Sequence, residues 1–186
     1  MQRSKESIYN QLLALKCRRG DSKAFEELIS LWERRLLYFI RRLVRDEQDA
    51  WDILQETWIK VMHEIGRLRN PEHLTTWLYR VARNTAVSHL RREIPRRDLT
   101  VSTEHDTIAS ETTETFAFED ADQVHRGLDL LSLPHREVLT LHFLEDMLID
   151  EIAMIIHVPA GTVKSRLFYA KRALRYILEQ GDDHHE

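Results

Sequence analysis

Apolar residues recur every three or four positions along most of this chain, which is the spacing of amphipathic helices. In the N-terminal half the spacing predicts four helices, at about 5–19, 22–45, 47–65 and from Asn70-Pro71 to about Arg92. Gly20 is placed to end the first helix, and Asp21 and Asp46 are placed to cap the second and third. We therefore expect a small helical bundle in this half of the chain.

The predicted third helix has apolar residues on two sides. Its core face is predicted to hold Ala50, Ile53, Leu54, Thr57 and Val61. Roughly opposite lie Asp52, Gln55, Glu56, Ile59 and Met62. A face that mixes apolar and acidic side chains is typical of a docking surface for another helix or protein. The alternative is that Ile59 and Met62 are buried against the first helix.

The predicted fourth helix is rich in arginine. Its buried stripe is Leu74, Trp77, Leu78, Val81 and Thr85, while another face carries Arg80, Asn84, Val87 and Arg91, with Arg83 beside it. Such side chains can donate hydrogen bonds to phosphates and base edges. The preceding loop contains Arg67, Arg69 and Asn70 and could hold an unstacked base. These features favour nucleic-acid binding over a merely solvated surface.

The C-terminal half has the form of a helix-turn-helix. Pro134 starts a helix that carries Val138, Leu139, Leu141 and His142. A helix at 149–156, a turn at His157-Val158-Pro159 and a helix at 160–178 are predicted to follow. Val163, Leu167, Ala170 and Leu174 form the buried edge of the last helix. The residues off that edge suit a recognition helix in the major groove. They are Thr162, Lys164, Ser165, Arg166, Tyr169 and Arg172.

Composition points to an all-α protein. The 186 residues include only 5 Gly and 4 Pro, while 31% are charged, which argues against a sandwich or barrel with many tight turns. The net charge of -4 conceals two basic blocks. Residues 67–97 hold eight arginines against Glu72 and Glu93, and residues 160–176 hold five basic residues and no acid. Local basic density of this kind attracts phosphate even when the whole chain is acidic.

An acidic segment separates the two basic blocks. Residues 98–122 contain eight acids, no Lys or Arg and no helical apolar stripe, so we expect an extended or disordered linker. It divides the chain into a domain at 1–97 and a helix-turn-helix domain at 123–186. A simple tether and a functional acidic element are both compatible with this composition.

Several classes of protein are disfavoured. The single cysteine, Cys17, cannot form an internal disulfide and indicates a reducing compartment. No apolar run approaches the ~20 residues that span a bilayer and no signal peptide is evident, so we expect a soluble, cytoplasmic protein without membrane insertion. Neither an HExxH pair, a Walker-type loop nor a GxSxG elbow occurs, and His184-His185 lies in a polar tail. We expect no metal site, cofactor, small-molecule substrate or catalytic activity.

The order of the motifs resembles that of the extracytoplasmic-function (ECF) sigma factors, the small promoter-recognition subunits of bacterial RNA polymerase. The matching segments are GDSKAFEEL, DEQDAWDILQETW, TTWLYRVARNTAVSHLRR, and LPHREVLTLHFLEDM followed by EIAMIIHVPAGTVKSRL. The resemblance covers nearly the whole chain. It implies two helical sigma domains, domain 2 and domain 4, joined by the acidic linker.

The resemblance also implies a role for each surface. Docking on the clamp coiled coil of the largest subunit of core RNA polymerase falls on Asp49, Asp52, Gln55, Glu56 and Ile59. Capture of the minus-ten strand of promoter DNA falls on Arg67, Arg69, Asn70, Arg80, Arg83, Asn84 and Arg91. Readout of the minus-thirty-five element falls on Thr162, Lys164, Ser165, Arg166, Tyr169 and Arg172. The domain around that last helix would contact the flap tip of the second-largest subunit. The acidic linker would thread the channel for nascent RNA.

The chain departs from the family pattern at several positions. Leu148 stands where Ser or Thr usually caps the first helix of the motif, with Asp150 as a substitute through the helix dipole, and His157 replaces a turn glycine. Trp58 replaces a common Phe. Tyr169 and Lys171 change the usual basic pattern, which leaves the preferred DNA sequence open.

Two further interpretations were weighed against the sigma factor. One is a free-standing DNA-binding regulator, which would not need the mixed face at 52–62. The other is an interaction module held by a helical inhibitor. This interpretation is compatible with a sigma factor, because many members of that family are sequestered by an anti-sigma factor.

Overall fold

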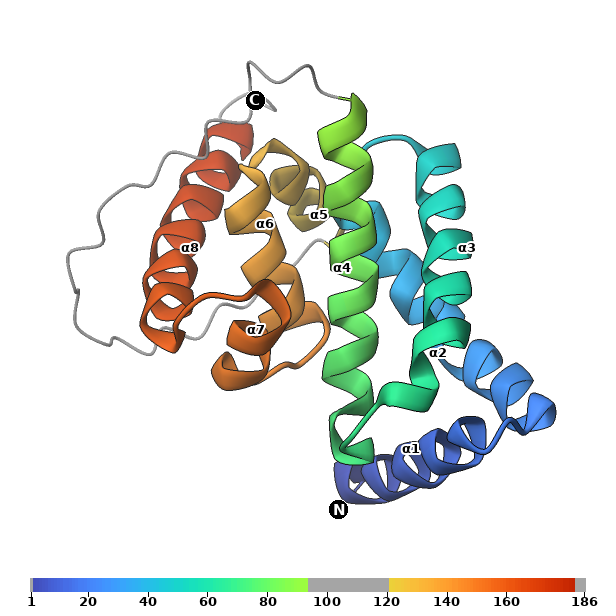
Figure 1. Ribbon diagram of the computed structural model, residues 1–186. Coiled ribbons are helices and arrows are strands. Elements are labelled where there is room, and N and C mark those ends of the chain that lie inside the picture. Colours follow the sequence, from blue (N-terminus) through green and yellow to red (C-terminus); the bar gives the residue numbers. More distant parts are fainter. Residues whose placement is uncertain (1, 94–120, 183–186) are drawn as a thin grey trace. The chain divides into compact units, whose positions relative to one another are not determined.

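Helices make up all the regular structure in residues 2–93 and 121–182, the part of the chain that the computed structural model describes (Figure 1). The chain divides into two compact units, the first built from α1 to α4 and the second mostly from α5 to α8. This agrees with the predicted all-α fold class.

Local capping groups set the first three helices. α1 (Gln2–Arg18) is followed by Gly20, whose φ of +81° is a left-handed conformation that glycine adopts readily. α2 (Ser22–Leu43) begins after Asp21, whose Oδ1 accepts a hydrogen bond from the Ala24 N–H at 3.1 Å. α3 (Glu47–Glu64) begins after Asp46, which accepts from the N–H groups of Gln48 and Asp49 at 2.7 and 3.0 Å. Both predicted N-caps are confirmed.

The fourth helix begins later than predicted. Two 3₁₀ turns, η1 (Ile65–Arg67) and η2 (Pro71–His73), precede α4 (Leu74–Glu93). Asn70 caps η2, because its Oδ1 accepts from the Glu72 N–H at 3.1 Å. A proline at the first position fits the start of a 3₁₀ turn as well as that of an α-helix, so Asn70-Pro71 alone could not fix the boundary.

Aromatic rings join the helices of the first unit. Tyr79 of α4 meets Trp32 and Phe39 of α2 edge-on, with ring centroids 6.0 and 5.3 Å away. Trp58 of α3 meets Phe25 of α2 in the same way at 6.2 Å and is buried. The larger ring at Trp58 therefore fills the core instead of changing the outer surface. The buried stripes predicted for the third and fourth helices are confirmed in full.

The second unit contains α5 (Ala121–Leu130), α6 (Leu133–Leu139), the π-helical turn η3 (Thr140–Leu144), α7 (Ile149–Ile156) and α8 (Ala160–Asp182). Sequence analysis missed α5, whose first two residues fall in the predicted linker; the rest of that linker lies outside the described residues. α5 approaches α8 closely, since a Cβ added at Gly127 would lie 2.8 Å from Leu174 Cδ1. The helix predicted from Pro134 ends at Leu139, so Leu141 and His142 belong to the π-turn.

The helix-turn-helix prediction is confirmed in its first helix and in its buried edge, while the second helix, predicted to end at about 178, continues to Asp182. His157 holds the turn in the left-handed conformation, with φ 57° and ψ 48°. The Leu148 N–H donates to the carboxylate of Glu151 at 2.8 Å, and Asp150 lies in the first turn of α7, where its effect through the helix dipole is predicted. Glu151 at the third helical position satisfies one free N–H, which is half of a capping box.

Candidate functional site

α3 presents a mixed apolar and acidic face to solvent. Ile59 and Met62 are each 55% exposed, so their burial against α1 is excluded. Asp52 and Gln55 are exposed on the same side of the helix, as is Trp51, which the sequence analysis left out. These five residues are called the α3 outer face below.

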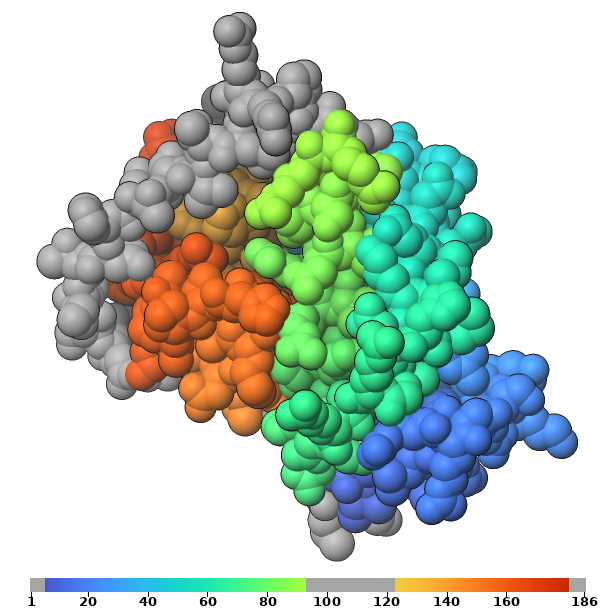
Figure 2. Space-filling model, viewed as in Figure 1, coloured from blue at the N-terminus to red at the C-terminus, as the bar shows by residue number. Residues whose placement is uncertain are grey.

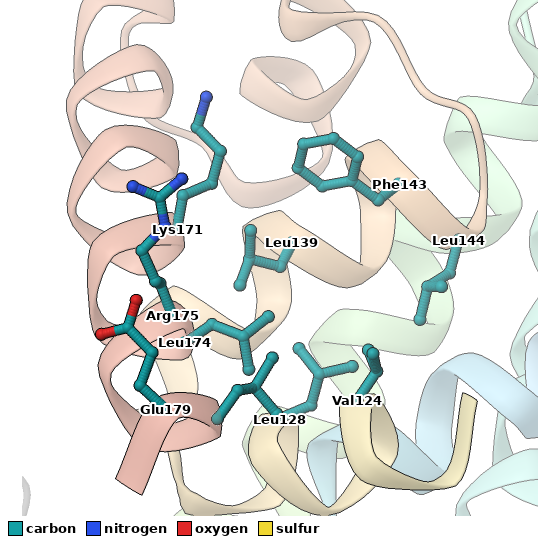
Figure 3. A pocket seen from close by; sticks show the side chains of 10 residues that line it. Val124, Leu128, Leu139, Phe143, Leu144, Lys171, Leu174, Arg175 and Glu179 are labelled. Atoms are coloured by element: carbon teal, nitrogen blue, oxygen red, sulfur yellow. The ribbon is translucent and has the colours of Figure 1, made fainter. Parts of the chain in front are cut away.

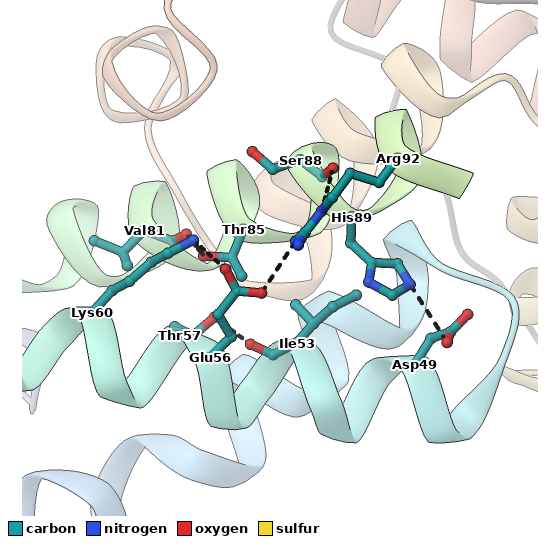
Figure 4. A network of polar contacts seen from close by, with 10 residues as sticks. All are labelled: Asp49, Ile53, Glu56, Thr57, Lys60, Val81, Thr85, Ser88, His89 and Arg92. Atoms are coloured by element: carbon teal, nitrogen blue, oxygen red, sulfur yellow. Dashed lines mark hydrogen bonds and ion pairs between the residues drawn. The ribbon is translucent and has the colours of Figure 1, made fainter. Parts of the chain in front are cut away.

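The other two carboxylates predicted for docking, Asp49 and Glu56, lie toward α4 (Figure 4). Asp49 Oδ1 is 3.4 Å from His89 Nε2, and Glu56 is 2.8 Å from Lys60 and 3.3 Å from Arg92. Hydrogen bonding and charge from Lys60, together with Arg92, hold the pKa of Glu56 below its ordinary value. Within the unit, these two carboxylates join α3 to α4 and border the α3 outer face, because Asp52 lies three residues after Asp49 and four before Glu56.

The turn segment, residues 65–73, carries three of the predicted strand-binding residues. Ile65 and Leu68 are buried. Arg67 lies between them and is exposed, and Arg69 and Asn70, which follow Leu68, are exposed as well. Both 3₁₀ turns pack against α1, and the space-filling view shows this neighbourhood as one continuous surface (Figure 2). The buried anchors hold the polar side chains outward on a fixed backbone.

α4 separates its predicted DNA-contacting residues into two groups. At 100° per residue, Arg80, Asn84 and Arg91 share one face, and Arg83 lies off it. Asn84 and Arg91 are exposed, whereas Arg80 and Arg83 are half-buried. Trp77, which belongs to the predicted buried stripe, is buried. The helix therefore offers two cations and an amide along one line.

α8 brings together five of its six predicted residues. Thr162, Ser165, Arg166, Tyr169 and Arg172 fall within an arc of about 120° around the helix, beside the buried edge, and are called the α8 outer face. Tyr169 and Arg172 are exposed, and the other three are half-buried. Ser165 Oγ donates to the Thr162 carbonyl at 3.1 Å, and the Arg172 guanidinium lies 5.8 Å from the centre of the Phe168 ring. Lys164 is exposed but points from the flank of the helix, away from this group.

An apolar pocket of about 370 Å³ opens within the second unit, between α5, the α6–η3 segment and α8 (Figure 3). Leu139, Phe143 and Leu174 are among its lining residues, and Lys171 and Arg175 stand on its α8 side. Phe143 is 50% exposed there. Because the carboxylate of Glu179 also lines the pocket, the pocket combines an apolar floor with an edge of mixed charge.

Other groups offer no chemistry of their own. Cys17 is buried, and desolvation, helped by the nearby Asp21 charge, raises the pKa of its thiol to about 11, which keeps it protonated. Within the described ranges there is no cluster of three or more potential metal ligands and no helix long and apolar enough to cross a membrane. His184-His185 lies outside those ranges.

Known proteins match most of this chain. Residues 28–94 match the family model of sigma-70 region 2, and residues 121–174 match that of sigma-70 region 4. The RNA polymerase sigma-H factor of Pseudomonas aeruginosa is 34% identical over 181 aligned residues, which cover 91% of this chain and 94% of that protein. The ECF RNA polymerase sigma-E factor of Escherichia coli K12 is 31% identical over 183 residues, with 91% and 94% covered. The chain belongs to the ECF sigma factors.

Solved structures agree with the fold of this sigma factor. CnrH, solved in complex with the cytosolic domain of CnrY, matches with a TM-score of 0.68 at 20% identity over 92% of this chain and 97% of CnrH. The sigma factor RpoE of Bartonella quintana, solved with the anti-sigma factor NepR, matches with a TM-score of 0.67 at 23% identity, over 84% and 98%.

Membership in this family decides between the functions that the sequence left open. The protein is an alternative sigma factor, which directs core RNA polymerase to promoter DNA at transcription initiation, and it is not an enzyme. A free-standing regulator would need region 4 alone, whereas this chain matches region 2 as well.

Proposed function

We propose that this sigma factor divides its work among three surfaces. The α3 outer face docks on core polymerase, the turn segment with Arg80, Asn84 and Arg91 holds the minus-ten strand, and the α8 outer face reads the minus-thirty-five element. The observation that carries the proposal is the exposure of Ile59 and Met62, at 55% each, beside Asp52 and Gln55 in region 2. Exposed apolar side chains rimmed by polar ones mark protein interaction sites.

The two DNA roles are supported by charge and chemistry. Exposed Arg67 and Arg69 can contact phosphates, and Asn70 keeps its amide nitrogen for a base edge while its oxygen caps η2. On α8, Thr162 and Arg166 stand near the helix N-terminus, the end that enters the major groove in helix-turn-helix proteins.

We further propose that domain 2 spans residues 1–97. The acidic linker was predicted at 98–122, but Ala121 and Asp122 belong to α5, so domain 4 is proposed to span residues 121–186. The pocket of Figure 3 is the surface proposed for the polymerase flap tip, because it offers an apolar floor for a docking segment. The sigma factor would act in the cytoplasm, where its polymerase is. An anti-sigma factor is a proposed partner, by analogy with the complex of the Bartonella protein.

Transcription by reconstituted holoenzyme from a random promoter library tests the division of roles. Ile59→Ala is expected to reduce transcripts from every promoter, because it weakens the holoenzyme. Arg166→Ala is expected to change which upstream sequences are enriched and to leave polymerase binding unchanged. The proposal fails if the two variants give the same profile, or if the unaltered protein yields no fixed start sites.

A further inference from the structure

We propose that Trp51 is an anchor of the docking on core RNA polymerase, where its indole packs against a cationic side chain of the polymerase. The inference rests on the proposed function of the α3 outer face. It goes beyond that proposal because the family resemblance assigns Trp51 no role.

The burial of the four tryptophans sets Trp51 apart. Trp32, Trp58 and Trp77 are 1%, 9% and 7% exposed, whereas Trp51 is 38% exposed. No ring, cation or hydrogen-bonding group engages Trp51 among the described residues. A large indole left at the surface of a well-packed unit is available to a partner.

The position of Trp51 on α3 makes it continuous with the proposed docking surface. Trp51, Gln55, Ile59 and Met62 follow at i, i+4, i+8 and i+11, so they form a ridge about 16 Å long on one side of the helix. Trp51 stands at the N-terminal end of this ridge and Met62 at the other. Interfaces draw most of their affinity from a few such large side chains, tryptophan above all.

The charges around the ridge indicate what the partner carries. Glu56 is paired with Lys60 and Arg92, and Asp49 lies 3.4 Å from His89. Among the described residues, Asp52 accepts only an amide hydrogen bond from Gln48, at 3.3 Å. Asp52 therefore keeps a negative charge that no basic group among the described residues pairs, and it lies about 100° around α3 from Trp51, on the Ile59 side of the ridge. An arginine or lysine of the polymerase that stacks on the Trp51 ring is attracted by this acidic side of the helix.

Affinity for core polymerase tests the anchor directly. Trp51→Ala is expected to weaken binding at least tenfold, and Trp51→Phe, which keeps an aromatic face, less than the alanine variant does. Ile8→Ala serves as the matched control, because Ile8 is a 63% exposed apolar residue on α1 of the same unit. This control is expected to bind like the unaltered protein, and helical circular dichroism checks that all variants fold.

A spectroscopic measurement separates contact from indirect effects. Protein labelled with 5-fluorotryptophan should give four fluorine resonances, and the Trp51→Phe variant identifies that of Trp51. Only the chemical shift of the Trp51 resonance should change strongly between H₂O and D₂O. Addition of unlabelled core polymerase should remove that sensitivity.

The outcomes distinguish this inference from the proposed function. If Ile59→Ala weakens polymerase binding while Trp51→Ala does not, or if the Trp51 resonance stays solvent-exposed in the holoenzyme, Trp51 is no anchor and the docking face stands. If neither variant weakens binding, the proposed docking face itself is wrong.

Discussion

At the scale of single residues, His157 shows a position where the backbone and the side chain disagree. Its φ of 57° is the left-handed conformation that costs most residues about 1–2 kcal/mol and glycine almost nothing. His157→Gly is therefore expected to stabilise the second unit by about 0.5–1 kcal/mol, after the greater entropy of unfolded glycine is deducted. Hydrogen exchange of the α7 and α8 amides in the full-length protein measures the change.

The β-branched variant His157→Val gives the opposite test. Valine is strained at positive φ, so faster exchange than in the unaltered protein is expected. Slower exchange in this variant, or no change in the glycine variant, would show that the turn is not strained at this residue.

Capping residues were predictable because their partners are close in the sequence. Asp21 and Asp46 bond to N–H groups two or three residues away, so the pattern contained both partners. At α7 the same reasoning was incomplete. Asp150 lies in the first turn, as the predicted dipole effect requires, but the bond of Glu151 to the free Leu148 N–H was not predicted. An acid three residues after the cap position was the available signal.

At the scale of helices, polar bridges between α3 and α4 set the register of the two proposed interfaces. Lys60 bonds to Glu56 on its own helix and donates to Thr85 Oγ1 of α4 at 3.2 Å, while Arg92 of α4 reaches Glu56 (Figure 4). The helix proposed for polymerase docking is thereby tied to the helix proposed for strand capture.

This bridge has a pH signature. Because the pKa of Glu56 in the folded protein lies below its ordinary 4.5, its charge stabilises the first unit above pH 4.5, and the contribution is lost as pH falls through the lowered pKa. Glu56→Gln should cost less than about 1 kcal/mol at neutral pH, since the side chain is 38% exposed, and nothing once Glu56 is protonated. Urea unfolding followed by tryptophan fluorescence measures this, because all four tryptophans lie in the first unit.

Glu33→Gln on the exposed surface of α2 provides the control, with no comparable loss expected at either pH. A cost of Glu56→Gln that persists in acid would mean that the ion pairs do not stabilise the unit.

The buried and exposed faces of a helix could be predicted where they follow from the local sequence pattern. Contacts of a side chain with residues far away in the sequence could not. The two faces of α3 followed from period and residue type, but Asp49 and Glu56 could not be separated from Asp52, because Arg92 is 36 residues from Glu56 in the sequence. α5 was not predicted, because it too depends on a contact with a residue distant in the sequence. It is a short helix beside an acidic run, and its packing depends on Gly127 meeting Leu174 of α8.

At the scale of the whole molecule, the two units should contribute independently to promoter use. Arg166 lies on α8 and Gln55 on α3, in different units. Arg166→Ala should cost about 1–3 kcal/mol on promoters that carry the base it reads, and little on others. Gln55→Ala should instead weaken polymerase binding to the same degree whichever promoter is present.

Free energies of two such separate sites add within about 0.5 kcal/mol. Initial rates of transcription at limiting holoenzyme, measured for both single variants and the double variant on two promoters that differ at the minus-thirty-five element, give the coupling between them. Additive losses are expected on both templates, because docking fixes how much holoenzyme forms and α8 fixes where it binds. A large coupling on one template alone would mean that the sequence read by α8 alters how α3 grips the polymerase, and the division into independent surfaces would have to be abandoned.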